Sequence, residues 1–169
     1  PLFVISDLGA TTAVVGLSFT LALIAQGTVM VRAGKYSDKN GRRPVIITGF
    51  SITMFALVIL VLADSIFLYL LAMVVLGIGA GFAASAGAIV GDVIKGRSGR
   101  VFAVWQMSGD AGMIVGPLLL GVIADLFSYR DAILVSAIIF SVAIFIAIRI
   151  PETNSVRLGD SEKPQLRED

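Results

Sequence analysis

The sequence predicts an all-α protein, a polytopic membrane helix bundle, and three observations support this prediction. The chain is 57% hydrophobic and 15% charged, whereas ordinary soluble domains carry about 25% charged residues. Five segments are long and apolar enough to cross a bilayer, whose hydrocarbon core of about 30 Å requires about 20 helical residues. The basic residues cluster after alternate segments, as they do in proteins that cross a membrane repeatedly.

The five predicted spans follow one another with short polar breaks between them. The first span ends before a basic stretch, and the second begins after Pro44. Asp64 and Ser65 separate the second span from the third. The predicted spans are residues 12–31, 45–63, 66–90, 101–124 and 132–150. A soluble helical core would need amphipathic outer helices, and none of these segments carries a charged stripe.

The basic residues predict the orientation of the bundle. Twelve of the 13 follow the first, third or fifth span, and Arg130 alone falls on the opposite side. Because cytoplasmic loops carry the excess of Lys and Arg, we expect a multi-pass protein of the plasma (inner) membrane. Residues 1–11 are then an extracellular or periplasmic stub, and residues 151–169 a flexible cytoplasmic tail. An odd number of spans with an external start fits a further helix before Pro1.

Several function classes are disfavoured by composition. The chain has no cysteine and no histidine, which excludes from it disulfides, Cys/His zinc sites, thiol nucleophiles and histidine acid–base catalysis. A formal net charge of +1 argues against a nucleic-acid partner, which would favour a clustered basic excess. We therefore expect no catalytic residues, no metal site and no cofactor.

The third span contains a run of mostly small residues that begins at Gly77. Gly77, Gly81, Ala84 and Ala88 recur at helical spacing, the pattern with which membrane helices pack closely. A dinucleotide-binding fingerprint is the competing interpretation of the GIGAG run. However, Phe82 stands where its third glycine belongs, and no strand is predicted before it. We therefore expect close helix packing along this span.

A compact motif, GKYSDKNGRRP, follows the first span. Its glycines, Gly34 and Gly41, suit a tight reversal between antiparallel helices. Asp38 is the only acid among five bases. It can pair with Arg42 or Arg43, or lie at the positive N-terminal end of a neighbouring helix. A generic basic loop would explain the bases and glycines but not the placement of the acid.

The pattern G-x3-D-x2-G-R-[RK], matched here at every fixed position, resembles the signature loop between the second and third helices of each half of the major facilitator superfamily. The resemblance extends over residues 9–153 and implies that the chain supplies five helices of a twelve-helix fold. It also implies that Asp38 holds the two halves in one state through a helix end. Arg42 and Arg43 would contribute an ion-pair network.

The fourth span carries GMIVGPLLLG, which is similar to the family's antiporter motif and includes Gly112, Gly116, Pro117 and Gly121. Leu120 departs from that motif, because a glycine belongs at its position. Pro117 removes a backbone donor, and the glycines leave room for a bend or a close neighbour. A kinked, tightly packed helix without a coupling role is the alternative interpretation.

Two further features favour the second half of such a transporter. Met73 and Leu76 stand where proton-coupled antiporters of the family usually have Arg and Gln in the fourth helix of the first half. The PET sequence at residues 151–153 resembles the family's ending after its final span. The chain would then provide helices eight to twelve of a drug/proton antiporter-like protein, with the N-terminal six-helix half as its partner.

The resemblance implies secondary transport of a small molecule. This transport would be coupled to protons and would proceed by alternating access. Polar residues inside apolar spans are candidates for the wall of the central cavity. For the uncharged ones, a hydrogen bond to a neighbouring helix is the favoured role. The candidates are Gln26 and Thr20 in the first span, Ser85 in the third, and Gln106, Ser108 and Asp110 in the fourth.

Asp110 is the strongest of these candidates. It follows Arg100 by ten residues, which places it about 15 Å along a helix and near the middle of the hydrocarbon core. A carboxylate at that depth usually faces a cavity and serves protons, ions or substrates. Gln106, one turn earlier, is the nearest helper. Alternatively, Gly109 and Gly112 loosen the helix, and Asp110 bonds the freed backbone groups.

Three other functions stay open at this stage. A facilitative pore or uniporter would favour rings of charge or backbone carbonyls along a path, and the spans hold one acid at depth. A membrane-embedded enzyme would need paired catalytic groups in one membrane layer, and no such pair is found in the sequence. A truncated, non-transporting fragment is the third alternative.

Overall fold

The computed structural model describes residues 2–84 and 99–149, and within these residues the chain is helical with no strand. The helices are α1 (Leu2–Ser6), α2 (Thr12–Asn40), α3 (Arg42–Val61), α4 (Ile66–Ala83), α6 (Gly99–Leu126) and α7 (Tyr129–Arg149). All except α1 are long and apolar enough to cross a membrane. The all-α bundle with five spans is therefore confirmed.

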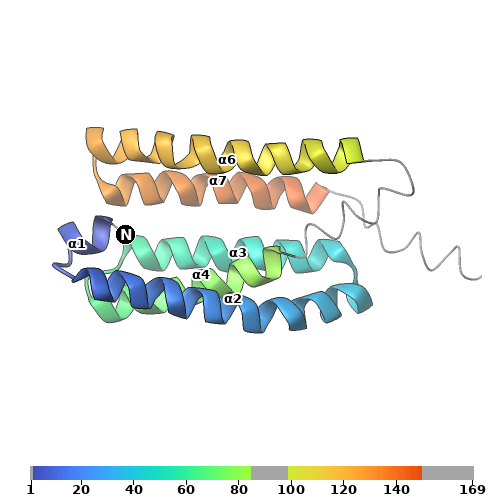
Figure 1. Ribbon diagram of the computed structural model, residues 1–169, viewed down its shortest axis with the longest axis horizontal. Coiled ribbons are helices and arrows are strands. Elements are labelled where there is room, and N and C mark those ends of the chain that lie inside the picture. The colour runs from blue at the N-terminus through green and yellow to red at the C-terminus, as the bar shows by residue number, and fades with distance from the viewer. Residues whose placement is uncertain (1, 85–98, 150–169) are drawn as a thin grey trace, which may run out of the picture.

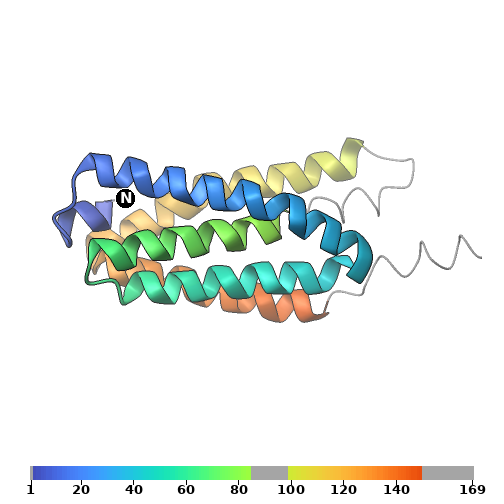
Figure 2. The ribbon, with the colours of Figure 1, turned by 90° about the horizontal axis from the view of Figure 1, so that it is seen from below.

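The long helices run side by side along the length of the molecule (Figure 1). In this view α2, α3 and α4 form one layer, and α6 and α7 form the other. Within the first layer α4 packs on both α2 and α3. The two layers meet chiefly where α7 packs on α3, while α6 packs mainly on α7. Figure 2 shows the three-helix layer from below, with α4 between α2 and α3.

The two ends of the bundle differ in charge. One end, here the Gly41 end, contains the α2–α3 turn, the start of α6 and the end of α7 (Figure 1). The other, the Arg130 end, contains α1 and the α3–α4 and α6–α7 turns. Of the eight basic residues in the described ranges, seven lie toward the Gly41 end. The acids of the Arg130 end are Asp7, Asp64, Asp125 and Asp131.

Glycines allow α4 to approach both neighbours in its layer. A Cβ atom on Gly77 would overlap the backbone of Ala22 in α2, and one on Gly81 would lie 2.8 Å from the carbonyl oxygen of Gln26. The predicted close packing is confirmed for these two positions. Ala84 follows α4 as its C-cap, and the next small position of the pattern, residue 88, lies outside the described residues.

The Arg130 end has an apolar core to which the short helix α1 contributes. Phe3 and Val4 of α1 are buried there with Tyr69 and Met73 of α4. The Tyr69 hydroxyl and the Ser18 hydroxyl of α2 form a buried hydrogen bond of 2.9 Å. Neither α1 nor this hydrogen bond was predicted from the sequence.

The observed helix ends differ most from the predicted spans at the Gly41 end. α2 continues from residue 31 to Asn40, because Arg32, Ala33, Lys35 and Lys39 are good helix formers and only the apolar stretch ends earlier. Gly34 therefore lies inside a helix, and its predicted part in the reversal is wrong. α3 begins at Arg42, ahead of Pro44. The predicted third span beyond residue 84 and the tail at 151–169 lie outside the described residues.

Candidate functional site

The most polar feature within a predicted span lies on α6. The Gln106 amide nitrogen donates a 3.1 Å hydrogen bond to the Asp110 carboxylate, one turn further along the helix. Both side chains are exposed, and so are the described side chains from Phe102 to Val115. Gln106 therefore bonds Asp110, as the sequence predicted. A carboxylate in the interior of a membrane-crossing helix, on a face that the described residues leave open, is available to a proton, a cation or another part of the protein.

The glycine and proline motif of α6 borders a cavity between the two layers. α6 is continuous through Pro117. Apart from the helix's own neighbouring backbone, no atom of the described part of the chain lies within 4 Å of a Cβ placed on Gly112, Gly116 or Gly121. The cavity has a volume of about 460 Å³. Its lining is almost entirely apolar and includes Phe19 of α2, Tyr69 and Met73 of α4, Pro117 and Leu120 of α6, and Ile133 of α7. Such a cavity suits an apolar ligand or an apolar side chain.

The motif predicted as a loop consists of two helix ends joined by one residue, Gly41. Gly41 has φ +98°, a conformation that glycine adopts without the strain of a Cβ atom. Its N–H donates to the Ser37 carbonyl at 3.0 Å. Arg42 donates to the Ser37 hydroxyl at 3.2 Å, and Ser37 is fully buried. Asp38 lies in the last turn of α2, beside this reversal.

Arg43 contacts a helix that the sequence motif gave no reason to expect. Its guanidinium donates to the backbone carbonyl of Ile148, close to the end of α7. The motif therefore connects three helix ends within the described part of the chain: those of α2, α3 and α7. The contact was missed because the two residues are 105 positions apart in the sequence.

The uncharged polar candidates occupy varied positions. Thr20 donates to Gly16 O at 3.0 Å and Ser108 to Val104 O at 2.8 Å, so both hydroxyls bond their own helices rather than a neighbour. Gln26 is half-buried on α2, where its backbone meets Gly81 of α4. The remaining candidate, Ser85, lies outside the described residues. The described residues contain no group of His, Cys, Asp and Glu suited to a metal ion.

Comparisons with known proteins give one consistent result. Residues 1–168 match the family profile of the Major Facilitator Superfamily. The chain is similar to the multidrug resistance protein MdtG of Proteus mirabilis (strain HI4320), with 23% identity over 79% of the chain and 33% of that protein. It is also similar to MdtG of Serratia proteamaculans (strain 568), with 28% identity over 72% of the chain and 30% of that protein. The chain thus spans about a third of the length of these relatives.

Proposed function

Because this chain belongs to the major facilitator superfamily, we propose that it forms helices eight to twelve of a twelve-helix secondary transporter. Such a protein rocks two halves around a central cavity, and it carries its substrate rather than transforming it. The N-terminal six-helix half would complete the cavity that the open face of α6 borders. The described chain is a multi-pass membrane protein by its family and its five apolar helices.

The observation that carries this proposal is Asp110 on the open face of α6. Insertion scales place the free-energy cost of an aspartate at a helix centre at about 2.5 to 3.5 kcal/mol. A carboxylate at that depth therefore usually has hydrogen-bond partners or binds a proton, an ion or a substrate. Gln106 supplies one hydrogen bond. The remaining oxygen lone pairs are available to a proton or to a cationic substrate. We therefore assign proton coupling to Asp110.

The substrate proposed is a small lipophilic compound, and the direction is export. The similar proteins named above are multidrug resistance proteins. In this chain, the cavity of about 460 Å³ beside Pro117 has an apolar lining, which favours apolar or amphipathic ligands over strongly hydrated ones. The apolar lining suits the lipophilic part of such a ligand. Asp110 lies outside this lining, on the exposed part of α6, and we propose that it provides the countercharge for a lipophilic cation there.

The direct experiment uses the full-length transporter in inside-out membrane vesicles. An imposed proton gradient should drive saturable uptake of the lipophilic cation tetraphenylphosphonium, and a protonophore should abolish it. Asp110→Asn preserves size and hydrogen bonding but cannot titrate, so uptake should lose its dependence on the gradient. Ser108→Ala, two residues away, is the control and should keep that dependence. Normal gradient dependence in the Asn variant would move the coupling group elsewhere, and unsaturable flux would favour a pore.

The Gly41 reversal is proposed to stabilise one state of the transport cycle through Asp38, Arg42 and Arg43. Asp38→Asn in the full-length protein should therefore lower transport strongly without reducing membrane insertion, because this residue lies beyond the apolar stretch of α2. Lys39→Gln, which changes a base at a variable position of the motif, is the matched control. Unchanged transport in Asp38→Asn would indicate a generic basic turn.

The proposed location is the plasma (inner) membrane with the Gly41 end in the cytoplasm. The excess of bases at that end supports this orientation. A reporter fused after residue 169 should report cytoplasm, and one inserted in residues 125–131 should report the outside. Both reporters on the same side would refute the five-span topology.

A further inference from the structure

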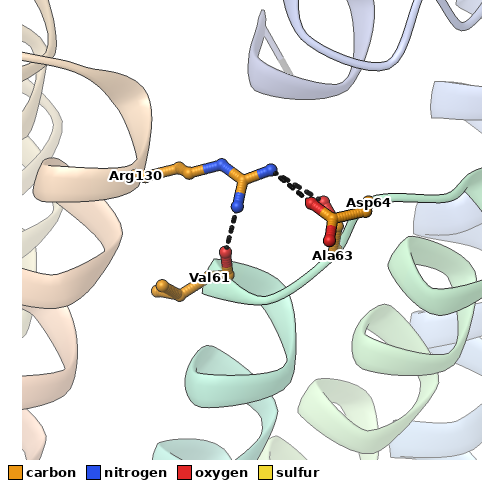
Figure 3. A network of polar contacts seen from close by, with 4 residues as sticks. All are labelled: Val61, Ala63, Asp64 and Arg130. Carbon is orange, nitrogen blue, oxygen red and sulfur yellow. Dashed lines mark hydrogen bonds and ion pairs between the residues drawn. The ribbon is translucent and has the colours of Figure 1, made fainter.

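Arg130 of α7 contacts the residues at the end of α3 (Figure 3) and also lies close to α1. Its guanidinium donates to the Val61 carbonyl at 2.9 Å and to the Ala63 carbonyl at 3.3 Å, where α3 ends. It also pairs with the Asp64 carboxylate at 2.8 Å. The guanidinium lies 5.6 Å from the centre of the Phe3 ring of α1. The sequence had indicated only that Arg130 lies on the less basic side of the membrane.

The opposite end of the same helix pair has the converse arrangement. α3 and α7 are antiparallel neighbours. Arg130 is the second residue of α7 and donates to carbonyls at the end of α3. Arg43 is the second residue of α3 and donates to the Ile148 carbonyl near the end of α7. Each helix therefore caps the C-terminus of the other with an arginine from its own first turn.

Helix electrostatics explain why this exchange is favourable. A cation in the first turn faces the positive end of its own helix dipole, which is unfavourable, whereas a cation at a helix C-terminus is stabilising. The last four carbonyls of a helix also lack intrahelical donors. Each arginine therefore supplies both a positive charge and N–H donors to the C-terminal carbonyls of the neighbouring helix. In α7, Asp131 in the first turn and Ser128 bond each other at 2.6 Å, which helps to offset the charge of Arg130.

Side chains fill the seam between these two ends. Phe50 and Phe140 meet edge to face with ring centres 5.9 Å apart, and the Ser141 hydroxyl lies 3.5 Å from the sulfur of Met54. This α3–α7 seam is the main junction between the two layers. A device that fixes both ends of the seam therefore fixes one layer relative to the other.

We infer that Arg43 and Arg130 form a reciprocal clamp that keeps α3 and α7, and with them the two layers, in a single rigid body throughout the transport cycle. The inference rests on the proposed function of alternating access. It makes Arg130 a positioning residue. It also gives Arg43 a role within the described helices, in addition to the motif's proposed role between halves.

The first test links the two helices covalently. Met54→Cys and Ser141→Cys in the full-length transporter, with other accessible cysteines removed, are joined by a short bis-maleimide. Because the clamp prevents movement at the seam, the linked protein should transport tetraphenylphosphonium at a rate close to that of the unlinked one. Transport by the unlinked variant establishes the transport function separately. Loss of transport on linking, with unlinked transport intact, would therefore overturn the clamp alone.

The second test separates the carbonyl contacts of Arg130 from its ion pair. Arg130→Gln should lower the melting temperature of the full-length protein and raise severalfold the rate at which Met54→Cys reacts with a small maleimide. Arg130→Lys should recover part of both effects, because an ammonium cannot bond both carbonyls in a fork. Asp64→Asn should change little, since the Asp64 side chain is 82% exposed.

Arg149→Gln provides the matched control for Arg130→Gln. Arg149 lies at the other end of α7, and its guanidinium is 4.5 Å from the ring of Phe145 in the same helix. Its replacement should leave the reaction rate of Met54→Cys unchanged. Equal rates in Arg130→Gln and Arg149→Gln would overturn the clamp, as would an Asp64→Asn effect as large as that of Arg130→Gln.

Discussion

The helices α4 and α6 are both rich in glycine, but they use it in opposite ways. Glycines of α4 are contact points: a Cβ on Gly77 or Gly79 would overlap atoms of α2 or α3. Apart from the helix's own neighbouring backbone, no atom of the described residues lies within 4 Å of a Cβ placed on Gly109, Gly112, Gly116 or Gly121 of α6. One third of the residues in the apolar stretch of α4 are buried, and none of the residues in the apolar stretch of α6 is buried. Small residues therefore mark close helix contacts in α4, whereas no described residue approaches the glycines of α6.

Polar side chains show the same contrast. On α4, Tyr69 reaches across to Ser18 of α2 in a buried hydrogen bond. On α6, Gln106 and Asp110 bond each other along one exposed face. α4 is the structural centre of its layer, and we propose that α6 is the working face of the transporter.

The largest effect is expected from a bulky residue at a glycine of α4. Gly77→Leu should destabilise the bundle by about 3 kcal/mol or more, because the side chain would have to displace the backbone of Ala22. A Cβ on Gly112 of α6 has no atom of the described residues within 4 Å beyond its own helix backbone, so Gly112→Leu should fold normally. Fluorescence-detected size-exclusion chromatography after heating measures both variants. Similar losses of monodisperse protein in the two would erase the distinction between the helices.

A smaller effect is expected from loss of the hydrogen bond between Tyr69 of α4 and Ser18 of α2. Tyr69→Phe removes the hydrogen bond to Ser18 and should lower stability by about 1 kcal/mol. The Ser18 hydroxyl keeps its 2.7 Å bond to the Val15 carbonyl, which limits the loss. Gln106→Met on α6 should leave stability unchanged and alter only the dependence of transport on the proton gradient. Thermal melts compare the two, and a larger stability loss in Gln106→Met would make α6 structural.

The smallest effect is expected at Ser108. Its hydroxyl is exposed and bonds the Val104 carbonyl of its own helix. Ser108→Ala should therefore change stability by less than about 0.5 kcal/mol and leave transport intact. A strong transport defect measured in vesicles would show that the working face of α6 extends beyond Asp110 and Gln106.

Sequence patterns predicted the apolar centre of every crossing helix and the close packing at Gly77 and Gly81. They failed where helix and membrane boundaries differ. α2 extends past its apolar stretch to Asn40 because hydropathy detects the edge of the bilayer and not the end of a helix. α1 was missed because five residues are too short to show a periodic pattern.

The connection within a single helix of the candidate site could be predicted from the sequence, and the connections between helices could not. The Gln106–Asp110 pair was foreseeable because residues one turn apart on a helix are neighbours. The contacts of Arg43 with Ile148 and of Arg130 with Val61 join residues 105 and 69 positions apart. No local spacing rule relates such residues. Only the packing of α7 on α3 brings them together.

Proton release on substrate binding tests the central claim about α6 most directly. Purified full-length transporter is placed in a weakly buffered detergent solution with a pH-sensitive dye, and tetraphenylphosphonium is added. We predict that the wild-type protein and Ser108→Ala release protons as the cation displaces them from Asp110. Asp110→Asn should bind the cation more weakly, because it lacks the countercharge, and should release no protons even at cation concentrations that saturate it. Proton release of wild-type size from Asp110→Asn would contradict the assignment of α6 as the coupling face.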